Sequence, residues 1–235
     1  MGGSAIKVTA RKLIDQVARL VAERSGATAN EVTFRGGAFW LENQVAPFVT
    51  LEALAGEVAS GSREVLAALQ AEGTFENTRL TYTYGTHIAH VAVDPETATV
   101  EVLRYVLVED VGRAINPLIV HGQAIGAAVQ GMGGTFLDQF LYDESGQLLT
   151  GTFGDYLLPT STDFPRVEAI TLQNFPSKLN PLGVKGAGEG GIVATGAALA
   201  NAVADALLDY GIKICDLPLS PNNLSRLIRD SKLST

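Results

Sequence analysis

The amino-acid sequence predicts an α+β fold in which helices and antiparallel hairpins are mixed. Some segments repeat apolar residues every three or four positions, as amphipathic helices do, whereas others are rich in β-branched and aromatic residues, as strands are. The two kinds of segment do not alternate in the regular order of a parallel α/β sheet. With 235 residues, 46% of them hydrophobic and 18% charged, the chain can bury a core in one large domain or two small ones.

The N-terminal part, residues 1–75, is predicted to be rich in helix. Apolar residues at helical spacing predict a helix over residues 3–24, which stops at a Ser-Gly pair. Two short apolar runs at residues 32–34 and 38–41 flank a Gly-Gly turn and predict a hairpin. A second helix is expected to open at Thr50.

The remaining part, residues 76–235, is expected to carry the functional site. Its first two segments, residues 79–94 and 99–110, are joined by a polar turn and predict antiparallel strands. The other elements expected, in chain order, are a helix over residues 119–137, strands over 140–149, 153–159 and 166–173, a helix over 191–208 and a short helix over 221–230.

Composition excludes several classes of protein. The net charge of −8 argues against a general nucleic-acid-binding role and gives no basic signal for an anionic membrane. The single cysteine, Cys215, excludes an internal disulfide framework and any zinc or iron–sulfur site built from several cysteines. No apolar run reaches transmembrane length and the N-terminus does not have the order of a signal peptide, so we expect a cytoplasmic protein.

The glycine-rich stretch NPLGVKGAGEGG, residues 180–191, contains one carboxylate, Glu189. An acid in such a loop before a helix is either a helix cap or a group with chemistry to perform. The loop also matches G-x-G-x-x-G, but prolines rather than a strand precede it and no acid follows at a strand end, so a dinucleotide site is disfavoured.

A second candidate site is the stretch GQAIGAAVQG, residues 122–131. Gln123, Gly126, Ala127 and Gln130 share one helical face, which is small and carries amides, so a heterocycle with donor and acceptor edges could approach it. The alternative is helix–helix packing through small residues.

Two further groups of residues have simpler interpretations. Asp110 and Gly112 at a strand end, followed by Asn116-Pro117, are typical of turns. His87 and His90 would point to opposite faces of a strand, which is a poor arrangement for a shared metal, and we interpret them as structural. We therefore predict no metal-ligating residues in the chain.

Four motifs together resemble a known family. In chain order these are DVGRAINP, GQAIGAAVQGMGG, DYLLP and NPLGVKGAGEGG. They resemble the C-terminal part of the molybdenum-hydroxylase large subunit, as found in xanthine dehydrogenases and aldehyde oxidases, and the last motif resembles the bacterial branch related to carbon monoxide dehydrogenase.

The resemblance implies roles for individual residues. Glu189 would be the catalytic base beside molybdenum. Gln123, together with Gly122, would contact the pterin cofactor, and the loop residues Lys185, Gly186, Ala187 and Gly188 would lie against it. A carboxylate at a helix start is kept ionised by nearby N–H groups, and glycines leave room for a bulky cofactor.

The resemblance also implies the cofactor, partners and reaction. The cofactor would be molybdopterin, in its cytosine dinucleotide form, shared with an N-terminal half of the subunit, and iron–sulfur and FAD groups would lie on partner subunits. The substrate would be an aldehyde, an N-heterocycle or carbon monoxide, oxidised with oxygen derived from water.

We expect the chain to be a separately encoded part of a split subunit or an isolated C-terminal piece, inactive alone. Small and apolar residues around 123–134 and 183–191 would then form an exposed patch. A non-catalytic assembly or scaffold piece of the same fold is the alternative, and a nucleotide-binding module is a third hypothesis.

Overall fold

The computed structural model describes residues 1–232, which form two compact units. Unit 1 comprises Met1–Arg79 together with Lys178–Leu182, and unit 2 comprises Leu80–Ser177 together with the chain from Gly183 onward. The mixture of helices and sheets confirms the predicted α+β class.

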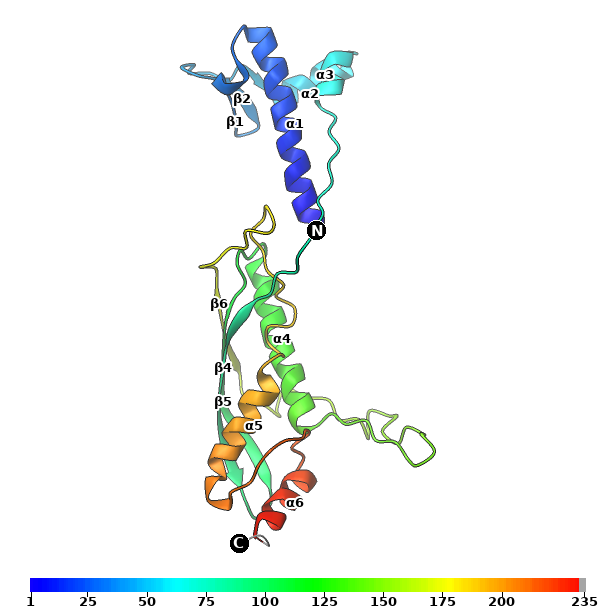
Figure 1. Ribbon diagram of the computed structural model, residues 1–235. Coiled ribbons are helices and arrows are strands. Elements are labelled where there is room, and N and C mark those ends of the chain that lie inside the picture. The colour runs from blue at the N-terminus through cyan, green and yellow to red at the C-terminus, as the bar shows by residue number, and fades with distance from the viewer. Residues whose placement is uncertain (233–235) are drawn as a thin grey trace. The chain divides into compact units, whose positions relative to one another are not determined.

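Unit 1 packs a long helix against a small sheet. Its elements are α1 (Gly2–Ser25), a 3₁₀ turn η1 (Ala29–Glu31), β1 (Val32–Arg35), β2 (Ala38–Leu41), β3 (Val49–Thr50), α2 (Leu51–Ala59) and α3 (Arg63–Ala68) (Figure 1). The predicted first helix and hairpin are present, and the second helix opens at Thr50 as expected, where the Thr50 hydroxyl caps it by accepting a hydrogen bond from the Ala53 N–H. The core joins all these layers through Val17, Val21, Phe39, Leu54 and Val65.

Unit 2 is built on a mixed sheet of three strands in the order β4-β5-β6. Strands β4 (Tyr84–Asp94) and β5 (Thr99–Asp110) are antiparallel, as predicted. Strand β6 (Val167–Leu172) was predicted in place, but it runs parallel to β5 because the chain returns through a helix and a long connection before pairing.

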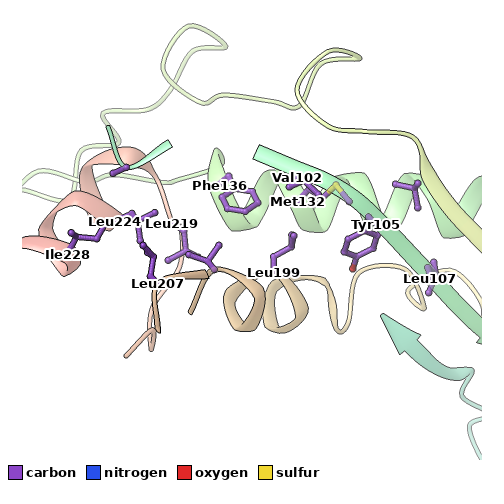
Figure 2. Packing of buried hydrophobic residues seen from close by; sticks show 14 of the residues in the cluster. Val102, Tyr105, Leu107, Met132, Phe136, Leu199, Leu207, Leu219, Leu224 and Ile228 are labelled. Carbon is purple, nitrogen blue, oxygen red and sulfur yellow. The ribbon is translucent and has the colours of Figure 1, made fainter. Parts of the chain in front are cut away.

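Two helices pack against this sheet and against each other. These are α4 (Pro117–Phe136) and α5 (Thr195–Ala206), followed by a 3₁₀ turn η2 (Leu208–Tyr210) and α6 (Pro221–Lys232) (Figure 1). Figure 2 shows the resulting core, in which Met132 and Phe136 from α4 and Leu199 from α5 lie beside Val102 of β5, and Leu219, Leu224 and Ile228 extend the cluster toward α6.

A β-bulge decides which face of β5 is buried. The register skips one residue, Leu103, between the pairs Val91–Val102 and His90–Arg104. Val102 is buried before the bulge, and Tyr105, Leu107 and Glu109 are buried after it. The bulge therefore turns Glu109, with the aromatic and leucine side chains, toward the interior.

The prediction of strands over residues 140–149 and 153–159 was wrong. Only one bridge, between Tyr142 and Leu148, forms in the first segment, and no strand forms in the second. The segment after α4 extends away from the sheet in Figure 1, and its apolar residues stay exposed, as with Phe153, or contact each other, as in the stacked rings of Phe140 and Tyr156. Without a neighbouring sheet to pair with, the apolar pattern does not produce strands.

Candidate functional site

The glycine-rich loop is fixed between two distant segments of unit 2. Val184 forms an isolated bridge with Gly112, just after β5, and Gly186 forms one with Tyr82, just before β4. The Lys185 N–H donates to the Val111 carbonyl at 3.0 Å and the Gly186 N–H to the Thr81 carbonyl at 3.0 Å. These backbone hydrogen bonds give the loop a defined path despite its glycine content.

Lys185 and Asp110 form a buried ion pair behind this loop. Their side chains are 8% and 3% exposed, and Lys185 Nζ lies 2.9 Å from Asp110 Oδ1 and 4.0 Å from the centre of the Tyr84 ring. Burial opposes ionisation of Asp110, but the Lys185 ammonium and the N–H groups of Gly112 and Asn174 outweigh it and hold the Asp110 pKa below its usual value. The Lys185 side chain, expected from the family resemblance to lie against the cofactor, is thus directed into the protein.

A chain of hydrogen bonds supports the residues that follow Glu189. His87 Nε2 lies 3.0 Å from the Gly190 carbonyl, and its Nδ1 lies 2.7 Å from the Tyr105 hydroxyl. The Tyr105 hydroxyl donates to Thr195, whose own hydroxyl donates to the Gly191 carbonyl at 2.6 Å. Burial lowers the pKa of His87, although its contact with the Gly190 carbonyl opposes this effect. The structural role expected for His87 is therefore that of a support for the loop.

Glu189 lies on the exposed side of the loop and is not a helix cap. The predicted helix over 191–208 begins only at Thr195, so the expectation that a helix start stabilises Glu189 was wrong. Residues 191–194 form turns instead, with the Ile192 and Val193 N–H groups donating to the Glu189 carbonyl. Within residues 1–232 no group donates a hydrogen bond to the Glu189 carboxylate, which leaves it available to a ligand.

The glycines of the loop fall into two classes. A Cβ atom on Gly191 would meet the Ala124 carbonyl and Ala127 of α4, and one on Gly190 would meet the Glu109 carboxyl group. By contrast, a Cβ on Gly188 would meet only the Gln123 Nε2 atom, at 3.6 Å. Packing within the chain therefore explains Gly190 and Gly191 but not Gly188, which lies at the surface.

The α4 helix has two different small-residue faces. Its buried face, with Ala124, Ala127, Ala128 and Gly131, packs against α5 and the residues before it, so the packing interpretation holds for Ala127. The other face is exposed and carries Gln123, Gly126 and Gln130. A Cβ on Gly122 or Gly126 would meet nothing within 4 Å. The structure thus brings Gln123 next to Gly188, and the expected exposed patch is confined to this face and the outer side of the loop.

A cavity of about 650 Å³ opens beside Glu189. It is lined by the segment Leu80–Gly85, by His87 and Glu109 of the sheet, and by Gly186, Gly188, Glu189, Gly190, Val193 and Ala194 of the loop. Glu109 was missed in the sequence, although it follows Tyr105 and Leu107 at strand spacing and could have been assigned to the buried face from that parity. The cavity therefore has two carboxyl groups, of which Glu189 is exposed and Glu109 is 1% exposed.

Comparison with known proteins identifies the family to which the chain belongs. Residues 1–165 match the molybdopterin cofactor-binding domain, and because this match covers more than half of the chain, the chain belongs to that family. The resemblance stated from the four motifs is confirmed. The match ends before the glycine-rich loop, so it does not itself reach Glu189.

Individual relatives are longer than this chain. It is 34% identical over 226 residues to subunit gamma of the 6-hydroxypseudooxynicotine dehydrogenase complex of Paenarthrobacter nicotinovorans, covering 95% of this chain and 28% of that protein. Among solved structures, quinoline 2-oxidoreductase from Pseudomonas putida 86 superposes with a TM-score of 0.81 at 33% identity, over 94% of this chain and 28% of the other. A Cu,Mo-CO dehydrogenase superposes with a TM-score of 0.89 at 24% identity, over 100% of this chain and 30% of the other, and shows the fold. The chain spans less than a third of the length of these relatives.

Proposed function

We propose that the chain supplies the catalytic base and one wall of the pterin site of a molybdenum hydroxylase. The observation that carries this proposal is the placement of Glu189, an exposed carboxylate that accepts no hydrogen bond from residues 1–232 and borders a cavity of about 650 Å³. Because it is exposed at this cavity, the Glu189 carboxylate can reach a bound substrate or cofactor.

The exposed small-residue surface fits a large planar cofactor. Gly122, Gly126 and Gly188 leave space that a side chain would fill, and the Gln123 amide beside Gly188 can donate and accept hydrogen bonds at a pterin edge. We assign cofactor contacts to Gln123, Gly122 and the outer backbone of residues 186–188. Lys185 supports this surface from behind through Asp110 rather than through its own ammonium.

The chemistry assigned to this chain is proton transfer. When bound, the molybdenum cofactor accepts the two electrons that substrate oxidation releases. Glu189 takes a proton from the water-derived oxygen that attacks the substrate, which makes that oxygen a better nucleophile. The buried hydrogen bonds from His87 and Thr195 to the adjacent carbonyls hold Glu189 at a fixed position for this step.

The remaining parts of the enzyme are proposed to come from partners. These are the N-terminal part of the molybdopterin subunit, an iron–sulfur subunit and an FAD subunit, with the cofactor in its cytosine dinucleotide form and the complex in the cytoplasm. Aldehydes, N-heterocycles and carbon monoxide are the substrate classes. No helix within residues 1–232 has the length and apolarity needed to cross a membrane.

The decisive experiment is Glu189→Gln in the assembled complex. We expect turnover to fall by about 10²–10⁴-fold while molybdenum content stays unchanged, because a positioned base is lost but the cofactor surface is not. Glu101→Gln, which neutralises an exposed glutamate on β5, is the matched control and should keep full turnover. Near-normal turnover by Glu189→Gln would refute the assignment, and a complex that binds molybdenum but has no turnover even in wild type would favour the scaffold alternative.

The pterin surface is tested by Gln123→Ala and Gly126→Ala. Both should lower molybdenum occupancy of the complex, the first through a lost hydrogen bond of about 1–3 kcal/mol and the second by filling space. Gly56→Ala in α2 is the control, because this exposed helical glycine also has nothing within 4 Å of its Cβ position. If Gln123→Ala and Gly126→Ala both leave occupancy unchanged, the exposed face of α4 does not hold the cofactor.

The chain purified by itself should contain no molybdenum and show no hydroxylase activity, because one wall cannot enclose a large anionic cofactor. Metal analysis tests this expectation. Stoichiometric molybdenum with turnover would show that the site is complete in this chain.

A further inference from the structure

Glu109 is a buried carboxyl group to which the proposed function assigns no task. Its side chain lies inside unit 2 with 1% of its surface exposed, and it lines the same cavity as Glu189. A Cβ on Gly190 would collide with Glu109 Oε2, so the loop backbone next to Glu189 rests directly on this carboxyl group. Gly190 therefore connects the two residues, because it follows Glu189 in the chain and its backbone packs against Glu109.

No cation in the described part of the chain neutralises Glu109. Neither carboxyl oxygen has a hydrogen-bond partner among residues 1–232. The candidate cations nearby are already engaged, because Lys185 pairs with Asp110 and both ring nitrogens of His87 contact Gly190 and Tyr105. An ionised carboxylate in this position would be desolvated without compensation, which strongly favours the protonated form.

The titratable groups around Glu109 do not offset the effect of its burial. His87 of β4 lines the same cavity, and burial lowers its pKa, which favours the neutral ring. The loop contributes Glu189 and the already paired Lys185, and Asp110 follows directly on β5 as an ionised carboxylate. None of these groups offers Glu109 a free positive charge that would compensate its burial. Burial accordingly raises the pKa of Glu109.

We propose that Glu109 is a positioning residue that holds Glu189 in place through Gly190, and that it does so as a neutral carboxylic acid. The inference rests on the proposed function, in which Glu189 is the base. A neutral acid can fill the space under Gly190, whereas an ionised Glu109 would place an uncompensated buried charge there. The site thus has one exposed carboxyl group, Glu189, which serves as the base, and one buried neutral carboxyl group, Glu109, which supports the loop beneath it.

The protonation state is tested by the thermal unfolding of the full chain with Glu109→Gln. A carboxyl group whose pKa is higher in the folded state binds more protons when folded, so its contribution to stability is present below the ordinary glutamate pKa of about 4.3 and is lost as the pH rises. The Tm of Glu109→Gln minus the Tm of wild type should therefore become more positive by about 3 °C or more from pH 4 to pH 7.5. The fixed effect of exchanging two polar groups cancels in this comparison, and Glu101→Gln on the same strand should show no such trend. A difference that does not change with pH would overturn the neutral state.

The positioning role is tested by two further measurements. Glu109→Ala should speed hydrogen exchange of the amides in residues 186–194, whereas Glu109→Gln should not, and unchanged exchange in the alanine variant would overturn the role. In the assembled complex, Glu109→Ala should lower kcat by up to about 10²-fold with little change in KM, and Glu109→Gln should restore most of it. If Glu189→Gln proves active, the proposed function fails, but the unfolding and exchange results still decide the state and packing of Glu109.

Discussion

Replacing Lys185 by methionine should destabilise unit 2 strongly, although the stem of the side chain is preserved. The substitution removes the ammonium that lies 2.9 Å from Asp110 Oδ1 and leaves a carboxylate that is 3% exposed. The remaining donors to Asp110 are backbone N–H groups of Gly112, Asn174 and Phe175, which carry no full charge. Removing one partner of a buried ion pair costs about 3–5 kcal/mol, because the other charge stays buried and uncompensated.

Thermal unfolding of the full chain measures this cost. For a unit of this size about 1 kcal/mol corresponds to about 2–4 °C, so Tm should fall by about 6–20 °C at neutral pH. The deficit should shrink as the pH falls toward about 4, because protonation of Asp110 removes the stranded charge, and adding Asp110→Asn should restore part of the lost stability. Arg104→Ala, which breaks the exposed pair with Glu168 on the same sheet, is the control and should change Tm little. A loss for Lys185→Met no larger than that of the control would refute the reasoning.

Two other predictions follow from the same loop. Gly191→Ala should lower the free energy of unfolding by about 1–3 kcal/mol, because the new Cβ meets the α4 backbone, whereas Gly188→Ala should leave Tm nearly unchanged; equal effects in denaturant titrations would contradict the division of the glycines. His87→Gln should reduce the loss of stability on acidification below about pH 6.5, because a histidine with a lowered pKa stabilises the folded state only while the ring is neutral. The exposed His90→Gln is its control, and identical pH profiles of Tm for both variants would show that His87 does not titrate as its burial implies.

The elements with a strong local pattern could be predicted from the sequence. Helix α1, the hairpin of β1 and β2, and the pair β4 and β5 combine regular apolar spacing with clear turn signals, and all were found. The segment over residues 140–149 has comparable apolar content but no strand beside it, and pairing depends on that neighbour rather than on composition. The parallel pairing of β6 with β5 likewise depends on the path of the chain between them.

The sequence allowed individual residues of the site to be predicted, but not the contacts between them. Glu189, Gln123 and Gly188 could be selected from their motifs, and the structure places the last two side by side, but their contact with a cofactor remains a prediction. The start of α5 was placed too early, because the apolar run after Glu189 continues through turns at residues 191–194 before the helix forms. The pairing of Lys185 with Asp110 joins residues 75 positions apart, which no local pattern encodes.

The contact between Glu109 and Gly190 constrains how related sequences can diverge. A side chain at position 190 requires space that the Glu109 carboxyl group occupies, so a substitution at position 190 alone is disfavoured in this chain. A shorter residue at position 109 would open that space and permit a small side chain at 190. The two positions, separated by 81 residues in the sequence, should therefore change together during evolution, and the residue next to the proposed base can vary only when the strand beneath it varies as well.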